Sequence, residues 1–281
     1  MLKLHLAVLL FGFAGLFGKL LTIPPPVIVW GRTFFAVISL VVFLGLGNRR
    51  RIRPSSPRDY ALLVFQGFLL AGHWLTFFHS IQVSSVAVGL LSFSTFPIFV
   101  LFLEAWLFKG RLTAQDLISA ALVFLGLALI VRSFQPGETT FIGAVWGTVS
   151  GLTFALLTLF NRKLSSSASP AAVALAQNLV AALVLTPFSL SELGLLPLTD
   201  WVLLAALGIF CTALAHSLFI ASLTQVRAFI ASLVACLEPV YGIVAAVFVL
   251  GEIPSLRQMA GGLIIVVMTG WTSLAHGRNQ G

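Results

Sequence analysis

The sequence contains little charge. Asp, Glu, Lys and Arg together make up 9% of its 281 residues, whereas hydrophobic residues make up 59%. Soluble domains carry about 25% charged residues. The composition therefore excludes a soluble domain and predicts a protein whose main solvent is the lipid bilayer.

Cysteine is also scarce. The two cysteines, Cys211 and Cys236, both lie inside apolar runs, where neither a disulfide framework nor a zinc site is expected. His73 and His79 are six residues apart, which places them roughly 120° apart around a helix, and no third ligand accompanies them. We predict no metal site and no cofactor.

Catalytic motifs are lacking as well. The sequence has no H-x-x-x-x-D, H-E-x-x-H or G-x-S-x-G motif, and its acids and histidines are scattered over different apolar runs. An intramembrane enzyme acting on lipid head groups would need a nucleophile, a base and orienting groups close together. A passive channel would show a ring of like charges or a filter sequence. We predict that the protein is not an enzyme, and keep both classes as alternatives.

Long apolar stretches dominate what is present. Ten stretches of roughly 17–25 residues are long enough to cross a bilayer as helices. The connections between them are short, and none is long enough for a soluble domain. The N-terminal stretch resembles a signal peptide but lacks a small-x-small cleavage site, so we expect a retained first helix. The ten predicted spans are 4–21, 27–47, 60–81, 85–108, 113–132, 141–161, 170–190, 199–223, 227–250 and 256–275.

The basic residues predict the orientation. With the N-terminus inside, twelve Lys and Arg residues fall in inner loops, among them the run at 49–53, and only Arg132 and Arg257 fall in outer loops. This bias predicts that both termini lie in the cytoplasm, and we expect the protein in the plasma (inner) membrane. Because the basic residues are divided among short loops, they do not form a nucleic-acid-binding face, and we predict no nucleic-acid partner.

The two halves of the chain resemble each other weakly. A shift of 142 residues aligns the third and fourth spans with the eighth and ninth, and it matches Pro97 with Pro239 and Phe77 with Phe219. Five spans per half is an odd number, so the second copy is inverted in the membrane. We predict an all-α polytopic membrane protein of two inverted five-helix repeats, residues 1–135 and 136–281, which together form one transport domain.

The most informative stretch is ACLEPVYG at 235–242. Glu238 lies near the middle of an apolar run, where an acid costs several kcal/mol unless it has a partner, a cavity or a proton. Pro239 lacks an N–H, so it bends or breaks the helix there, and Pro97 is expected to do the same in the first half. Glu238 is therefore a proton-coupling candidate. The alternative is a protonated carboxyl group that bonds backbone groups freed by the proline.

Several motifs resemble those of the drug/metabolite transporter superfamily, specifically its EamA-type ten-span members. They are LEPVYGIVAAVFVLGE at 237–252, QMAGGLIIVVMTG at 258–270, FSTFPIFVLFLEAWLFKGRLT at 93–113, FLGLALIV at 124–131 and PPPVIVWGRTFFA at 24–36. The resemblance covers essentially the whole chain. It implies secondary transport, commonly export, of small metabolites such as amino acids. It also implies a cavity built from spans one to four and six to nine, with spans five and ten at the side.

Other polar and aromatic residues are candidates to line such a cavity. The long side chains of Lys19 and Arg32 either anchor the helix ends at the membrane interface or attract a substrate carboxylate. A histidine in an apolar span is either a hydrogen-bonded packing residue or a group that binds substrate or a proton. The candidates are Lys19, Arg32, Trp74, His79, Ser94, Gln177, His216 and Tyr241.

The sequence thus predicts a secondary active transporter that works by alternating access and exports a small polar or zwitterionic metabolite, with proton coupling as an option. The predicted partners are the small-molecule substrate and the lipid bilayer. The small residues Ala260, Gly261 and Gly262 favour close helix contact, either within the monomer or at a homodimer face.

Overall fold

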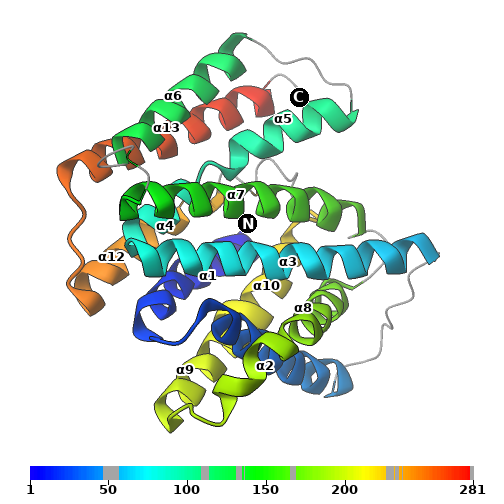
Figure 1. Ribbon diagram of the computed structural model, residues 1–281. Coiled ribbons are helices and arrows are strands. Elements are labelled where there is room, and N and C mark those ends of the chain that lie inside the picture. The colour runs from blue at the N-terminus through cyan, green and yellow to red at the C-terminus, as the bar shows by residue number, and fades with distance from the viewer. Residues whose placement is uncertain are drawn as a thin grey trace.

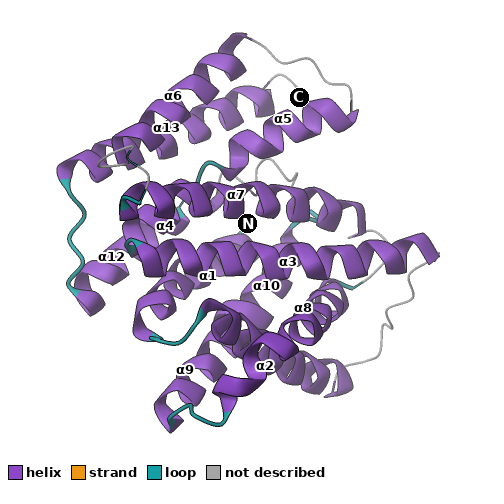
Figure 2. Cartoon of the chain, in the orientation of Figure 1, coloured by secondary structure: helices purple, strands orange, loops and turns teal. Residues whose placement is uncertain are grey.

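A computed structural model shows a helical protein (Figure 1), and no strand occurs among the residues that it describes. The structure describes residues 1–46, 57–108, 114–130, 135, 137–164, 169–225, 231, 234–235 and 237–278. Short loops join many of the helices (Figure 2). The first-half helices are α1 (Leu2–Leu20), α2 (Pro25–Leu46), α3 (Pro57–Val83), α4 (Val86–Phe93), α5 (Phe96–Phe108) and α6 (Ala114–Ile130). The second-half helices are α7 (Thr139–Leu164), α8 (Pro170–Leu193), α9 (Leu198–Gly208), η1 (Ile209–Leu214), α10 (Ala215–Ser222), α12 (Glu238–Leu250) and α13 (Leu256–Arg278).

The helices agree with the predicted spans. Within the described ranges, seven helical segments are long and apolar enough to cross a membrane, and α4 with α5 and α9 with α10 each count as one segment. Three shorter apolar helices are Leu117–Leu129, Glu238–Leu250 and Leu256–Met268. This confirms an all-α, multi-pass membrane protein with about ten spans.

The fourth span is interrupted next to Pro97. Helix α4 ends at Phe93 and α5 begins at Phe96, with Pro97 at its second position. The Ser94 hydroxyl donates to the Leu90 carbonyl (2.8 Å) and the Thr95 hydroxyl donates to the Ser92 carbonyl (2.8 Å). The Leu90 carbonyl also accepts the backbone N–H of Ser94 (3.0 Å) and the Ser92 carbonyl that of Thr95 (3.3 Å), so each hydroxyl adds a second donor where α4 ends. Pro239 has the matching place in α12, directly after Glu238, the first residue of that helix.

The eighth span differs from the regular helix that we expected over 199–223. Residues Ile209–Leu214 form a π-helical turn, η1, between α9 and α10. The Thr212 hydroxyl donates to the carbonyl of Leu207, five residues earlier (2.8 Å). A π-turn inserts one residue into a helix and frequently marks a functional site.

The helices divide into a main bundle and a side layer (Figure 1). Helices α6 and α13 pack against each other at one side of the molecule. In the main bundle α3 packs on α7, α2 on α8, and α1 on α12. Each of these contacts joins the first half of the chain to the second.

A hydrogen bond to Glu252 joins the two halves of the chain at one end of the bundle. Gly251 ends α12 with a left-handed backbone (φ +68°), a conformation that glycine adopts without strain. The next residue, Glu252, accepts a hydrogen bond from the backbone N–H of Val86, the first residue of α4 (2.9 Å). A carboxylate at this position satisfies an N–H at the positive end of the α4 dipole.

Helices α1 and α12 touch at two glycines. A Cβ atom added to Gly12 would lie 2.9 Å from the carbonyl oxygen of Glu238, and one added to Gly242 would lie 2.8 Å from the carbonyl oxygen of Gly12. Both distances are too short for a real side chain. The glycines therefore set how closely α12, and with it Glu238, approaches α1.

Replacing Gly12 with alanine should separate these helices. We expect Gly12→Ala to destabilise the protein by about 1–3 kcal/mol, the usual cost of overpacking, and to lower the melting temperature in detergent. The matched control is Gly72→Ala in α3, where an added Cβ meets nothing within 4 Å. That variant should be unchanged or slightly more stable. Equal melting temperatures for the two variants would contradict the packing role of Gly12.

Candidate functional site

A cavity lies at the centre of the main bundle and is lined by both halves of the chain. The first half contributes residues of α1, α2, α3 and α4, and the second half contributes one residue each from α7, α10 and α12. The lining residues are Phe11, Ala14, Arg32, Leu70, His73, Trp74, Phe77, Phe93, Phe154, His216 and Glu238. None comes from α6 or α13.

The cavity is small in this conformation. Its volume of about 30 Å³ holds only about two water molecules, since one water needs roughly 10–15 Å³ by the same measure. A larger guest therefore requires the lining helices or side chains to move.

Arg32 is the only arginine among the lining residues, and it is buried, with 1% of its surface exposed. Its Nε atom donates to the Thr212 hydroxyl (2.9 Å) and Nη2 donates to the Cys211 carbonyl (3.3 Å). The guanidinium carbon lies 3.8 Å from the ring centroid of Trp74, a cation–π contact. Nη1 is buried and has no hydrogen-bond partner. One guanidinium nitrogen of Arg32 therefore has no hydrogen-bond partner, and the side chain lines the central cavity.

The π-turn supplies both acceptors for Arg32. Cys211 and Thr212 are residues of η1. A Cβ atom added to Gly208, just before the turn, would lie 2.7 Å from the Arg32 carbonyl oxygen. Glycine at this position therefore lets α2 approach closely enough for the guanidinium to reach the turn.

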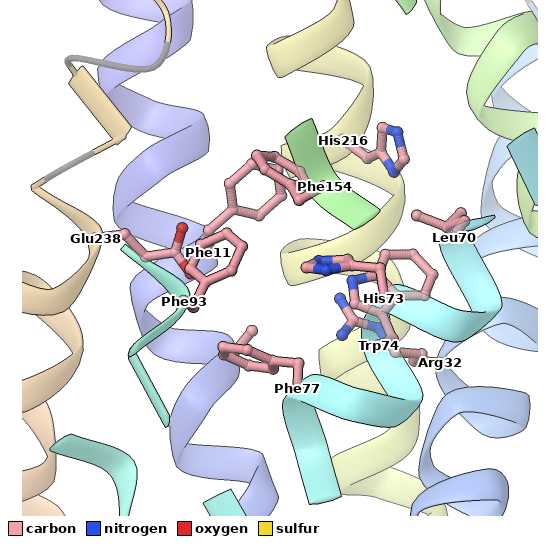
Figure 3. A pocket seen from close by; sticks show the side chains of 11 residues that line it. Phe11, Arg32, Leu70, His73, Trp74, Phe77, Phe93, Phe154, His216 and Glu238 are labelled. Carbon is pink, nitrogen blue, oxygen red and sulfur yellow. The ribbon is translucent and has the colours of Figure 1, made fainter. Parts of the chain in front are cut away.

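Glu238 faces the same cavity from the opposite side (Figure 3). It is 4% exposed, and its carboxyl group forms no hydrogen bond or ion pair with the residues that the structure describes. A basic and an acidic side chain, Arg32 and Glu238, therefore share this cavity without forming an ion pair. As the first residue of α12, Glu238 also lies at the positive end of that helix dipole.

Aromatic rings form the wall between the two charges (Figure 3). The His73 ring lies 5.0 Å from Phe154 and 5.5 Å from Phe93, measured between ring centroids. His73 Nδ1 lies 2.8 Å from the Ser150 hydroxyl and 3.1 Å from the Ser150 carbonyl, which fixes the ring. The His216 ring meets the Trp74 ring edge-on at 6.1 Å. The middle of the cavity therefore favours an apolar or aromatic group.

The structure divides the predicted site residues into two groups. Four of them line the central cavity: Arg32, Trp74, His216 and Glu238. The alternative interpretation of Arg32 as an anchor at the membrane interface is wrong, because its side chain is buried and bonded to another helix.

The other five candidates do not line the cavity. Lys19 donates from Nζ to the Ser84 carbonyl (2.8 Å) at the end of α3, and His79 packs edge-on against Trp146 (5.4 Å). The Ser94 hydroxyl bonds within its own helix. Tyr241 packs beside Gly12, where α1 meets α12. Lys19 lines a separate pocket beside Pro24 and Gln82 instead.

Gln177 belongs to a separate buried cluster of amides. Its Nε2 donates to Asn161 Oδ1 (2.7 Å) and to Gln66 Oε1 (3.0 Å), and Gln66 also donates to Asn161 (3.3 Å). All three side chains are at most 2% exposed. The cluster joins α3, α7 and α8, so the predicted cavity role of Gln177 is replaced by a role in helix packing.

Sequence reasoning missed most of the cavity wall. His73 was not among the candidate lining residues, and nothing in the sequence distinguished Phe11, Phe93 and Phe154 from the other phenylalanines, of which the chain has 25 in all. Thr212 gave no signal, because a π-turn has no sequence pattern that we recognised. Cys236, Lys109 and Arg111 lie outside the described residues.

Comparison with known proteins identifies the family. The EamA-like transporter family matches residues 1–132 and again residues 141–274. An uncharacterized transporter of Bacillus subtilis is 26% identical and covers 100% of this chain and 90% of its own length. An S-adenosylmethionine uptake transporter of Rickettsia bellii is 23% identical, over 85% of this chain and 80% of its own. A solved crystal structure superposes with a TM-score of 0.70 over 100% of this chain and 98% of its own, at 16% identity, which shows a shared fold.

Removing the Thr212 hydroxyl should expose its role in holding Arg32. We expect Thr212→Val to lower the free energy of unfolding by about 1.5–3 kcal/mol, because a buried guanidinium N–H loses its acceptor. The matched control is Thr158→Val, another fully buried threonine, whose hydroxyl bonds only to its own helix at Phe154. Denaturation of both variants in detergent measures the difference. Equal losses would show that Thr212 does not support Arg32.

Proposed function

The chain belongs to the EamA-like transporter family and is a multi-pass membrane transporter, and we propose that the central cavity binds its substrate. We propose further that the protein is a secondary active transporter, located in the plasma membrane with both termini in the cytoplasm. Its substrate is a small metabolite with a carboxylate at one end and an ammonium group at the other, such as an amino acid with an apolar side chain.

A single observation carries this proposal: an unpaired guanidinium nitrogen and a carboxylate without a partner face one cavity from opposite sides. A buried charge without a partner costs several kcal/mol. A zwitterion would satisfy both groups at once, with its carboxylate at Arg32 Nη1 and its ammonium group at Glu238. The aromatic wall would contact the apolar part of the molecule.

The position of the cavity favours alternating access. It lies between the two halves of the chain, beside the interruption in the fourth span and at the start of α12. Transporters of this plan commonly bind substrate near the membrane midplane beside interrupted helices, and the halves rock around the site. In this mechanism the lining helices must move before the cavity can hold a substrate, because its present volume is about 30 Å³.

Export is the direction that the family resemblance implies, and we propose it here. One relative is named for uptake, so flux must be measured in both directions. Purified protein in liposomes also separates the alternative classes. Exchange of a preloaded solute indicates a carrier, current indicates a channel, and chemical conversion indicates an enzyme.

Arg32→Lys should weaken recognition of the carboxylate. Lysine is a point charge that cannot bond Thr212, stack on Trp74 and present a free N–H at once. Loss of one charge-assisted hydrogen bond, about 1.5–3 kcal/mol, predicts a KM roughly 10- to 150-fold higher in liposome exchange. The wild type should prefer an amino acid over its carboxamide, and the variant should lose most of this preference.

The control for this substitution is Arg162→Lys, at the partly exposed ion pair between Arg162 and Glu104 (2.8 Å). We expect its KM to stay close to that of the wild type, because exposed ion pairs contribute little. Melting temperatures separate loss of recognition from loss of folding. A folded Arg32→Lys variant that still prefers the acid over the amide would overturn the assignment of Arg32.

Glu238→Gln tests the opposite end of the cavity. The variant keeps the shape of the side chain and removes its charge and its titration. We expect it to insert and fold, to lose its preference for ammonium-bearing substrates over their deaminated analogues, and to lose any effect of a pH gradient on flux. Glu104→Gln is the control and should retain both properties. Unchanged pH dependence in a folded Glu238→Gln variant would exclude Glu238 as the proton carrier.

A further inference from the structure

A second, larger cavity opens on the side of the molecule, away from the central site. It is a groove of about 1170 Å³ between α2, α8 and the segment η1–α10, with Lys3 of α1 at its edge. This volume exceeds the ~300–1,000 Å³ of typical small-molecule pockets. Its lips carry exposed apolar side chains: Val41 and Phe43 on α2, and Phe210 and Leu214 on η1. The groove therefore opens sideways to the lipid.

The groove has the length of one lipid leaflet. Its wall runs from Ile209 to Ala221 along η1 and α10, a distance of about 18 Å at 1.5 Å per residue. Half of the hydrocarbon core of a bilayer is about 15 Å thick. An acyl chain thus fits along the groove.

Groups that attract an anion are concentrated at one end of the groove. Lys3 lies at the end where α1 begins, α2 ends and α8 begins. Ser169, the N-cap residue of α8, makes no capping hydrogen bond, and its buried hydroxyl has no partner. The dipole of α8 attracts an anion to this end, whereas Pro170 has no N–H and the N–H groups of Ala172 and Val173 bond the Ser169 carbonyl (3.0 Å each). Lysine, hydroxyl and helix terminus together form a cradle for a phosphate group.

A further unpartnered hydroxyl lies part-way along the groove. Ser217 of α10 lines it, and its Oγ atom is buried without a hydrogen-bond partner. Among the mostly apolar lining residues of the groove, such a hydroxyl is a donor for an ester carbonyl. The polar groups therefore follow the order of a phospholipid, with phosphate at the end, then ester, then hydrocarbon.

We propose that this groove is a binding site for one anionic phospholipid, with the phosphate held by Lys3, Ser169 and the start of α8 and one acyl chain lying along α10. With the N-terminus in the cytoplasm, this end of the groove faces the inner leaflet, where anionic lipids attract basic residues. The positive charge of Lys3 at this end is complementary to an anionic head group.

A lipid in this groove would contact the segment that holds Arg32. Ile209, Phe210 and Ala213 of η1 line the groove, whereas Cys211 and Thr212 of the same turn bond the guanidinium of Arg32. The π-turn therefore lines the groove and also bonds Arg32, which lines the central cavity. Occupancy of the groove restricts movement of that turn and, through it, the position of Arg32.

Native mass spectrometry of the delipidated full-length protein tests the site without reference to transport. Dioleoyl phosphatidylglycerol and dioleoyl phosphatidylcholine are titrated separately into the protein in detergent. We expect one phosphatidylglycerol to bind at lower concentration than phosphatidylcholine. Lys3→Glu should weaken phosphatidylglycerol binding by at least about fivefold, since one cation near the surface contributes about that factor. Ser217→Phe should fill the groove and abolish binding of both lipids.

Matched variants control for nonspecific effects. Lys163→Glu makes the same charge change at the end of α7, and Ala121→Phe makes a similar size change on the exposed face of α6. Both should bind phosphatidylglycerol like the wild type. Equal affinity for the two lipids, or the same loss in Lys3→Glu and Lys163→Glu, would overturn the proposal. If the lipid-free wild-type protein is a dimer and the folded Ser217→Phe variant is a monomer, the groove would be assigned to a second copy of the chain instead.

Discussion

A charged guanidinium deep in an apolar protein is the constraint on which the centre of the structure depends. Without partners its burial would cost several kcal/mol. The protein offsets this cost with the Thr212 hydroxyl, a backbone carbonyl and the face of Trp74. These partners in turn require a π-turn in the eighth span and a glycine at 208, where α2 meets it closely. The local geometry of α2, α3 and η1 thus depends on one buried charge.

The other side of the cavity is built by a different principle. Glu238 depends on the contact of Gly12 with Gly242, which brings α12 against α1, and on Pro239, which follows it in the first turn of the helix. The two charges are therefore placed by separate helix pairs and are separated by aromatic rings. A rearrangement that separates α1 and α12 from α2 and η1 would change the distance between the charges without breaking the bonds that hold either one.

Much of the fold follows from the sequence, because apolar length is all that a membrane span requires. The ten spans and the break before Pro97 are visible as patterns along the chain. The cavity could not be predicted in the same way. Its residues come from seven helices, and the sequence does not show which of these helices pack against one another. Arg32 and Glu238 are conspicuous as charges in apolar runs, but Gln177 has the same conspicuous polarity and pairs with other amides instead. Polarity shows that a residue needs a partner, and only the packing shows which partner it has.

The hydrogen bond between Glu252 and the Val86 N–H has a mechanical consequence. It fastens the far end of α12, in one half of the chain, to the first turn of α4, in the other half. Each of these short helices carries a lining residue at its opposite end, Glu238 on α12 and Phe93 on α4. The two helices can therefore rotate together about this end while the hydrogen bond stays intact. They can separate at this end only if the bond breaks.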